Sequence, residues 1–310
     1  MRRPAPASSE YRASLLAIWS ALIAVYLIWG STYLAIRYAV ETTPPFSMAA
    51  ARFIVSGGFL YAMRRMSGDS APKWLEWRNA AIIRIFLLVG GNGGVVWAEE
   101  FVTSSLAALL VATVPLWMVL IDALRPGGRW PGFMAASGIF IGFGGVILLI
   151  GSAVNDARAM NLLGAAALVV ASLSWAMGSL YSRSAILPAS QLLGTSMEML
   201  AGGVALFVIA GAVGEWNRFD LVAVSTRSAV AVAYLTVIGS GGFVAYVWLL
   251  RVAPTPLVAT YAYVNPLVAV LLGYFLAHEP MTLRTLLATA LIIASVVLVS
   301  IPKATNSETA

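Results

Sequence analysis

Aromatic and hydroxyl side chains recur at helical spacing inside two strongly apolar stretches of the chain. In the first stretch, Tyr26, Trp29 and Tyr33 follow one another at intervals of three and four residues, which places them on one face of a helix. In the second, Trp175 and Ser179 are related in the same way. Rings and hydroxyls so arranged can stack on a small organic molecule and hydrogen-bond to it. The alternative is an aromatic belt at a membrane surface.

Three ionisable residues, Arg52, Glu198 and Glu99, stand inside or at the end of apolar stretches. An isolated charge in such surroundings costs about 3 kcal/mol on insertion scales unless it is paired or hydrated. We expect Arg52 and Glu198 to form an ion pair, because opposite charges relieve each other's burial. Proton coupling is the alternative for Glu198 and Glu99. Glu99 and the adjacent Glu100 could instead mark the solvated end of a helix.

Proline and paired glycines interrupt several apolar stretches near their centres. Pro115 and Pro266 each remove a backbone hydrogen bond. Glycine pairs lower helix stability and let backbones approach closely, and they occur at Gly93 with Gly94 and at Gly241 with Gly242. Broken backbone within a membrane is tolerated where it is packed in protein or faces a wet cavity. We therefore predict helix breaks here, around a binding region, with simple packing kinks as the alternative.

Polar and aromatic residues next to these interruptions would complete the binding region. The amides of Asn92 and Asn265 could hydrogen-bond to a polar group of a ligand. The rings of Trp97, Tyr261 and Tyr263 are close enough in sequence to contact an aromatic group. The predicted site is therefore amphipathic.

The residues that common enzyme and metal sites require are missing. Cysteine is absent, His278 is the only histidine, and no His-Glu-x-x-His, Gly-x-Ser-x-Gly or Walker sequence occurs. We predict no catalytic residue, no metal site and no cofactor, which disfavours an intramembrane enzyme. The absent Walker loop also argues against direct use of ATP.

Membrane-spanning helices are the elements that must position these residues. Apolar residues make up 60% of the 310-residue chain and charged residues 10%, against roughly 45–50% and 25% in soluble domains. Stretches long enough to cross ~30 Å of hydrocarbon predict an all-α protein of ten helices. These are Leu15–Ala35, Ser47–Met63, Ala80–Ala98, Leu106–Leu124, Phe133–Gly151, Leu162–Tyr181, Leu192–Val213, Ala229–Leu250, Leu257–Leu276 and Leu283–Ile301.

Positive charges indicate how these helices are oriented. If the chain starts in the cytoplasm, most of its Lys and Arg residues fall in cytoplasmic segments, as the positive-inside rule requires. Both termini are therefore predicted to be cytoplasmic. The net charge of +6 does not indicate a nucleic-acid partner, because the basic residues are scattered between apolar stretches.

Similar features follow in the same order in the two parts of the chain, 1–156 and 157–310. Trp29 corresponds to Trp175, and Pro115 to Pro266. In the same way Arg52 corresponds to Glu198, and the first glycine pair to the second. Because each part contains an odd number of predicted spans, the second would lie upside down in the membrane. Such inverted repeats are typical of secondary transporters.

The chain also resembles a known family. The resemblance is carried by Tyr26-Leu-Ile-Trp-Gly-Ser-Thr-Tyr33, Pro44-Pro45, Ala51-Arg52-Phe53, Ala98-Glu99, Val111-Ala-Thr-Val-Pro115 and Tyr261-Ala-Tyr-Val-Asn-Pro266. These segments are similar to those of EamA-type permeases of the drug/metabolite transporter superfamily, and within it of the YedA and PecM subgroup. The resemblance implies ten helices around a central cavity, and the export of amino acids, pigments, nucleotide-type metabolites or toxic organic compounds.

These observations predict a secondary transporter of the bacterial inner membrane that exports small amphipathic metabolites by alternating access. A facilitative channel or uniporter and an uptake carrier are the alternatives, since the direction of transport rests on the resemblance alone. The expected partners are a small-molecule substrate and the lipid bilayer. Gly138 and Gly142, like Ala290 and Ala294, are spaced for close helix packing, which leaves both a monomer and a homodimer open.

Overall fold

A bundle of helices makes up the computed structural model, which describes residues 14–125, 130–151, 162–253, 255–258 and 260–300. Within these ranges every regular element is helical. The elements are α1 Leu15–Ala39, α2 Pro45–Met66, α3 Trp74–Arg84, the π-helix η1 Ile85–Gly93, α4 Gly94–Ala98, α5 Ser104–Val111, α6 Val114–Leu124, α7 Phe133–Gly151, α8 Leu162–Ser182, α9 Gln191–Ala212, α10 Glu215–Arg218, α11 Thr226–Val252, α12 Thr255–Val258, α13 Tyr261–Ala277 and α14 Leu283–Ser300.

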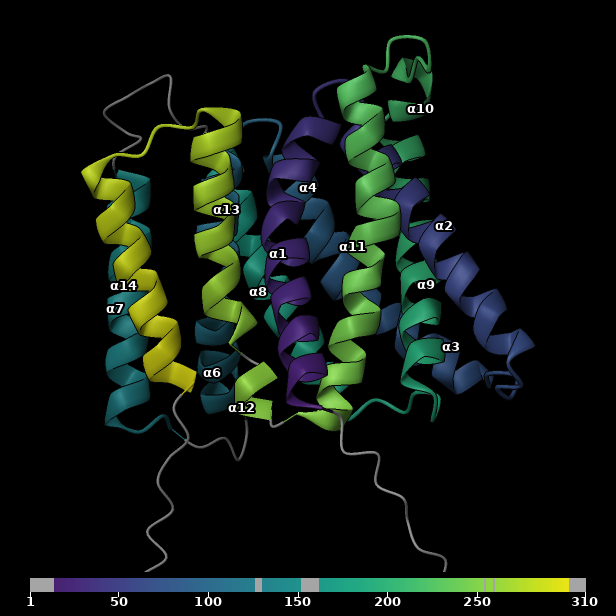
Figure 1. Ribbon diagram of the computed structural model, residues 1–310, viewed down its shortest axis with the longest axis horizontal. Coiled ribbons are helices and arrows are strands. Elements are labelled where there is room, and N and C mark those ends of the chain that lie inside the picture. The colour runs from purple at the N-terminus through teal and green to yellow at the C-terminus, as the bar shows by residue number, and fades with distance from the viewer. Residues whose placement is uncertain (1–13, 126–129, 152–161, 254, 259, 301–310) are drawn as a thin grey trace, which may run out of the picture.

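The helices stand side by side, and α1 begins at the same end of the bundle at which α14 ends (Figure 1). We call this the terminal end and the opposite one the distal end. The short helix α10 lies at the distal end and α12 at the terminal end (Figure 1). The predicted boundary between the two halves, at residues 156 and 157, lies outside the described residues.

Seven helical segments are long and apolar enough to cross a membrane, and three shorter apolar helices accompany them. The seven are Leu15–Ala39, Pro45–Met66, Trp74–Ala98, Ser104–Leu124, Leu162–Ser182, Gln191–Ala212 and Thr226–Tyr246, and the three are Phe133–Leu148, Tyr261–Ala277 and Leu283–Val299. Each predicted stretch coincides with one helix or with a run of consecutive helices. Ten membrane crossings, and their orientation, stay a prediction.

Side-chain caps begin several of the helices. Ser14 accepts a hydrogen bond from the backbone of Ala17 at the start of α1, and Ser190 accepts one from Leu193 at the start of α9. Such caps satisfy amide groups that the first turn of a helix leaves free. Polar residues at the ends of the apolar stretches therefore fix where the helices begin.

The predicted helix breaks occur at only some of the expected positions. At Pro115 a break is present, because α5 ends at Val111 and α6 begins at Val114. Gly93 ends the π-helix and Gly94 begins α4, so the helix changes its winding there but does not stop.

At three other positions the prediction of a break is wrong. Gly241 and Gly242 lie inside the continuous helix α11. Two glycines lower helix stability by about 1 kcal/mol each, which the contacts of α11 along α1 can offset. Pro266 lies inside α13, so the proline is accommodated and the helix does not end there.

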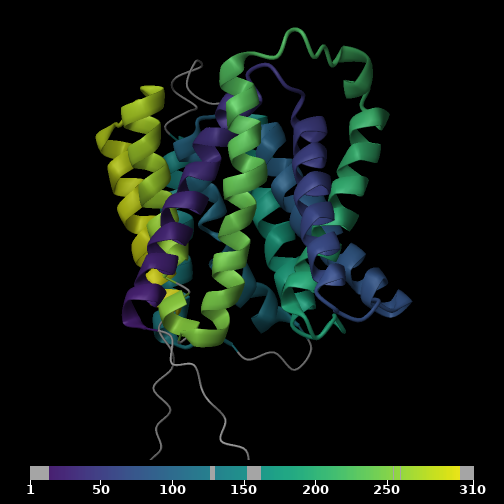
Figure 2. The same ribbon diagram turned by 45° about the vertical axis from the view of Figure 1, so that its right-hand side comes forward.

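Five close helix pairs organise the bundle, and each joins a helix before residue 152 to one after residue 161. The pairs are α2 with α9, α7 with α14, α1 with α11, α1 with α13, and η1 with α8. After rotation of the view, α1 and α11 still lie side by side, while α14 lies at the edge of the bundle (Figure 2). The two halves of the sequence are therefore interleaved rather than separate.

The crossing of α2 and α9 generates a first prediction. A Cβ atom on Gly57 would lie 2.8 Å from Met199 Cβ and 3.0 Å from the backbone nitrogen of Leu200. We expect Gly57→Ala to force the helices apart and to lower stability by about 1–3 kcal/mol, as overpacking does. The neighbouring Gly58 is the matched control, because a Cβ there would meet its nearest neighbour only at 3.9 Å.

The measurement is the thermal unfolding midpoint of the purified protein in detergent. Gly58→Ala should leave the midpoint unchanged or raise it slightly, since alanine is the better helix former. Equal midpoints for the two variants would show that the stability of the protein does not depend on the close approach of α2 and α9 at Gly57.

Candidate functional site

A cavity of about 620 Å³ lies at the centre of the bundle. This volume lies within the range of roughly 300–1,000 Å³ that is usual for small-molecule sites. Its wall is built from α1 to α3, η1 and α4 to α6 of the first half and from α8, α9, α11 and α13 of the second. It reaches the terminal end at Arg183, Pro188 and Gln191, in and beside the loop between α8 and α9.

Most of the predicted site residues line this cavity. They are Trp29, Tyr33, Arg52, Asn92, Pro115, Trp175, Ser179, Glu198, Tyr261, Asn265 and Pro266. They come from seven separate helices, so the structure brings together residues that lie far apart in the sequence. Asn92 and Asn265 each present a buried Oδ1 atom that has no hydrogen-bond partner.

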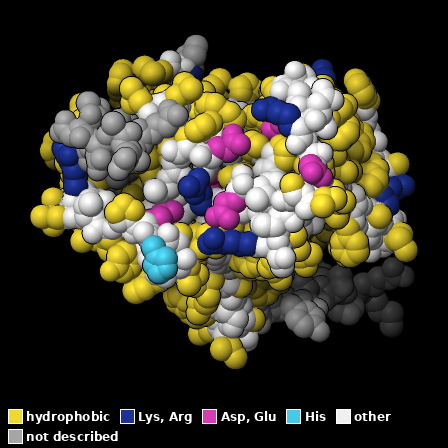
Figure 3. All heavy atoms as spheres, turned by 90° about the horizontal axis from the view of Figure 1, so that it is seen from above, with side chains coloured by type: hydrophobic (Ala, Val, Ile, Leu, Met, Phe, Trp, Pro, Cys, Tyr) yellow, Lys and Arg dark blue, Asp and Glu magenta, His cyan; other side chains and the backbone are white. Residues whose placement is uncertain are grey.

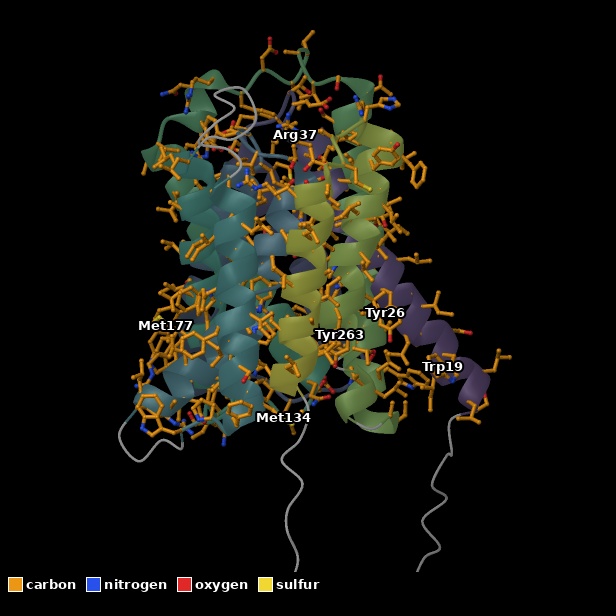
Figure 4. All side chains as sticks on the ribbon, turned by 90° about the vertical axis from the view of Figure 1, so that its left-hand side faces the viewer. Trp19, Tyr26, Arg37, Met134, Met177 and Tyr263 are labelled. Atoms are coloured by element: carbon orange, nitrogen blue, oxygen red, sulfur yellow. The ribbon has the colours of Figure 1, made fainter. Side chains whose placement is uncertain are left out.

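Other predicted residues lie outside the cavity wall. The hydroxyl of Tyr26 hydrogen-bonds to the Thr260 hydroxyl, and Tyr26 lies along α1 between Trp19 near one end and Arg37 near the other (Figure 4). Trp97 packs edge-on against Phe101, with 5.1 Å between the ring centroids. Tyr263, Gly93, Gly94, Gly241 and Gly242 are also absent from the wall.

Trp29 is held by an aromatic cluster and by a glycine of the other half. Its ring centroid lies 5.0–5.2 Å from those of Phe243, Tyr246 and Tyr261. A Cβ atom on Gly242 would lie 2.7 Å from Trp29 Nε1. Gly242 therefore provides a flat seat for the indole ring instead of a break in α11.

Trp175 is seated in the same manner on the π-helix η1. A Cβ atom on Gly91 would lie 2.7 Å from Trp175 Cε3. Within the glycine-rich run from Gly90 to Gly94, the residue that lies against Trp175 is Gly91, and not Gly93 or Gly94, which correspond to the second glycine pair. π-helical turns are frequent at functional sites, and here the turn carries both Gly91 and Asn92.

The expected ion pair between Arg52 and Glu198 does not form. Glu198 instead accepts a hydrogen bond and an ion pair from buried Arg84 of α3. The reason is that Arg52 and Glu198 lie at different levels along the axis of the bundle. Gly57 contacts Leu200, and Gly203 contacts Ile54, so α2 and α9 run antiparallel and the residues opposite one another are not those related by the repeat.

Antiparallel helices separate equivalent residues along their axes. At 1.5 Å per residue, the register of α2 and α9 places Arg52 and Glu198 roughly 10 Å apart along the bundle. Arg84 lies inside the predicted Ala80–Ala98 span. A positive charge within that span could therefore have identified it as a partner for Glu198.

Arg52 and Glu99 carry buried polar atoms that have no hydrogen-bond partner. Arg52 is 5% exposed, and its Nε and Nη1 atoms have none. Glu99 is fully buried one residue beyond α4, and both of its carboxylate oxygens lack partners, while its backbone oxygen accepts a bond of 2.6 Å from Arg37. Burial raises the pKa of Glu99, the Glu279 carboxylate adds to the rise, and Arg37 and Arg52 oppose it. A coupling role for Glu99 stays a prediction.

Two buried carboxylates of the second half cap helices of the first half at the distal end. Glu215 accepts hydrogen bonds from the backbone of Phe46 at 3.1 Å and of Ser47 at 2.7 Å, at the start of α2. Glu279 accepts bonds of 2.8 and 3.0 Å from the backbone of Ser104 and Ser105, at the start of α5. A carboxylate is stabilised by the free amides and the positive dipole of a helix N-terminus.

Further contacts join the halves at the same end. Tyr38 donates to the backbone oxygen of Leu276 at 2.9 Å, and Arg227 lies 3.5 Å from Glu41 in an ion pair. Acidic and basic side chains gather near the middle of this face of the molecule (Figure 3). We call these contacts, together with the Glu215 and Glu279 caps, the distal seal.

The buried ion pair generates a second prediction. Glu198→Gln should lower the thermal unfolding midpoint strongly, because it leaves Arg84 buried without its counter-charge, at a cost of about 3–5 kcal/mol. Arg52→Gln should cost much less, since Arg52 forms no ion pair among the described residues.

The double variant Arg84→Met/Glu198→Met is the matched control, and it should recover most of the stability lost in Glu198→Gln. Thermal unfolding in detergent measures all three variants. Losses of equal size in Arg52→Gln and Glu198→Gln, with no recovery in the double variant, would contradict the pairing.

Comparison with known proteins supplies the family. The EamA-like transporter family matches residues 15–151 and again residues 162–301. The uncharacterized inner membrane transporter YedA of Escherichia coli K12 is 40% identical over 93% of this chain and 92% of its own length. A WAT1-related chloroplast protein of Arabidopsis thaliana is 23% identical over 92% of this chain and 70% of its own length.

The fold is also similar to that of a solved crystal structure, with a TM-score of 0.60 at 19% identity over 92% of this chain and 98% of the other. Both the family match and the similarity to YedA cover nearly the whole chain, and they agree with the bundle of apolar helices. The chain therefore belongs to the EamA-like transporter family of the drug/metabolite transporter superfamily and is a multi-pass inner membrane transporter rather than an enzyme.

Proposed function

We propose that the protein is a secondary transporter that exports small amphipathic metabolites through its central cavity by alternating access. The observation that carries the proposal is the cavity itself, which both halves line and which reaches the terminal end. At the distal end the two carboxylate caps and their neighbours join the halves. A site that is accessible from one end and sealed at the other favours a carrier over a channel.

An inverted repeat of two five-helix halves is part of this proposal, and the helix pairs support it. If each helix is replaced by its counterpart in the other half, the pair of α1 and α11 becomes the pair of α8 and η1. The pair of α2 and α9 and the pair of α7 and α14 are unchanged by this replacement. The two tryptophan seats, Trp29 on Gly242 and Trp175 on Gly91, are similarly placed in the two halves, although the glycine that corresponds to Gly242 is Gly94. Ten crossings with cytoplasmic termini complete the proposed architecture.

The lining favours an amphipathic cargo. Aromatic rings of Trp29, Trp175 and Tyr261 share the wall with the polar groups of Asn92 and Asn265. Rings offer apolar stacking surfaces, and the amides offer hydrogen bonds. Amino acids, aromatic metabolites and drugs have this dual character. Export rather than uptake rests on the resemblance to family exporters, and a uniporter or an uptake carrier is the alternative.

The experiment that tests the transport proposal generates a third prediction. Purified protein in liposomes should show saturable counterflow with at least one member of a panel of amino acids, aromatic metabolites and organic cations. Trp175→Ala should reduce this counterflow by about tenfold or more, because it removes a ring from the cavity wall. A pH gradient applied in parallel reports proton coupling.

Trp97→Ala is the matched control, since Trp97 packs on Phe101 and does not line the cavity. It should retain counterflow. Flux that rises linearly with concentration and shows no counterflow would favour a channel, and normal kinetics in Trp175→Ala would remove that residue from the site.

The distal seal generates a fourth prediction, which tests alternating access directly. The chain contains no cysteine, so a single cysteine introduced for Ala108, which lines the cavity and is 1% exposed, reports access without background. In intact cells a membrane-impermeant maleimide should label Ala108→Cys slowly. Adding Glu279→Ala should increase labelling severalfold, because the start of α5 loses its cap.

Glu100→Ala is the control, because Glu100 is an exposed carboxylate at the same end that caps no helix. Labelling that is the same with and without Glu279→Ala would contradict the seal. Labelling that increases only in inside-out vesicles would instead show that the distal end faces the cytoplasm, opposite to the proposed orientation.

A further inference from the structure

We propose that Arg52 binds a carboxylate group of the transported molecule, so that the cargo is an organic acid with an apolar body and a hydrogen-bond donor. This inference rests on the proposed function, because it names the chemical class that the central cavity selects. It assigns to Arg52 a ligand outside the protein in place of the ion pair expected from the sequence.

The first support is that Arg52 is buried in the cavity wall with free donors. Its side chain lines the cavity, only 5% of the residue is exposed, and its Nε and Nη1 atoms have no hydrogen-bond partner. Arginine is always charged and its guanidinium matches a planar carboxylate. A buried guanidinium without a hydrogen-bonded counter-charge is costly, so a site that retains one is prepared for an anion.

The second support is that the protein's own carboxylates do not occupy this position. Glu198 is committed to Arg84. Glu99 is near enough to attract Arg52 electrostatically, but no ion pair links the two within the described residues. The guanidinium of Arg52 stacks on its neighbour Phe53, with 4.3 Å from the guanidinium carbon to the ring centroid.

The third support is the charge of the wall as a whole. The charged lining residues are three arginines, Arg52, Arg84 and Arg183, and one carboxylate, Glu198. Three positive charges less one negative charge leave the lining at +2. Such a wall raises the local concentration of anions and disfavours organic cations.

The remaining free groups of the wall define the rest of the ligand. The Oδ1 atoms of Asn92 and Asn265 are buried acceptors without partners, and they suit an amine or amide N–H of the cargo. Trp175 offers a ring for the apolar body. A carboxylate needs only Arg52, whereas a phosphate dianion would need a second unpaired cation beside it. Arg183, the other lining arginine outside the Arg84–Glu198 pair, lies at the terminal end of the cavity, in the loop after α8.

The test compares ligands that differ only in the acid group. Phenylalanine and phenylalaninol share a ring and an amine, and only the first has a carboxylate. Phenylacetate and phenyl phosphate compare two anions without the amine. For the full-length protein in detergent, the thermal unfolding midpoint at increasing ligand concentration gives apparent affinity, and counterflow in liposomes gives transport.

We expect phenylalanine to bind the unmodified protein at least about tenfold more tightly than phenylalaninol, because one charge-assisted hydrogen bond changes affinity by about that factor. Arg52→Gln should abolish this difference, and Arg52→Lys should preserve part of it by keeping the charge. Arg125→Gln removes the same charge from an exposed position outside the cavity, and it should behave like the unmodified protein.

Each outcome decides for or against the assignment. Equal binding of acid and alcohol, or an unchanged difference in both Arg52 variants, overturns it, and so does the absence of stabilisation by either carboxylate. Tighter binding of phenyl phosphate than of phenylacetate overturns the choice of carboxylate. If the carboxylates stabilise the protein through Arg52 but no counterflow occurs, the site stands and the proposed transport fails.

Discussion

Every part of this structure depends on the scarcity of water inside a hydrocarbon layer, where a polar group must find its partner within the protein. Most polar side chains of the bundle obey this constraint. Arg84 and Glu198 satisfy each other, and Ser56 donates to the backbone oxygen of Arg52 one turn earlier. Several groups that lack a partner, on Trp29, Asn92 and Asn265, share one cavity with Arg52. These are the groups that the proposed ligand would satisfy.

The helices and the family could be predicted from the sequence because both depend on local information. Hydropathy and length locate each apolar stretch, and each coincides with a helix or a run of helices. The three-to-four spacing also placed Trp29 and Tyr33 on the cavity face, although Tyr26, which shares the spacing, lies outside the wall. These patterns do not need the tertiary fold, since the period of a helix decides which side chains point the same way.

The partners of individual residues could not be predicted in the same way. Equivalence in a repeat suggested that Arg52 and Glu198 would meet, but antiparallel helices place equivalent residues at different depths. Glycines at 241 and 242 suggested a break, although the nearest neighbour of Gly242 is the indole of Trp29. In both cases the decisive information is which helix lies opposite, and this is a property of the packed bundle rather than of any one segment.

The tryptophan seats have a consequence for how such a protein can move. Trp29 packs against Gly242 of α11, and Trp175 against Gly91 of η1, so closely that a methyl group on either glycine would collide with the indole ring. Each seat therefore locks a helix of one half to a helix of the other. We expect these mixed pairs to move as rigid bodies in the conformational cycle. Each moving unit would then contain helices from both halves of the sequence.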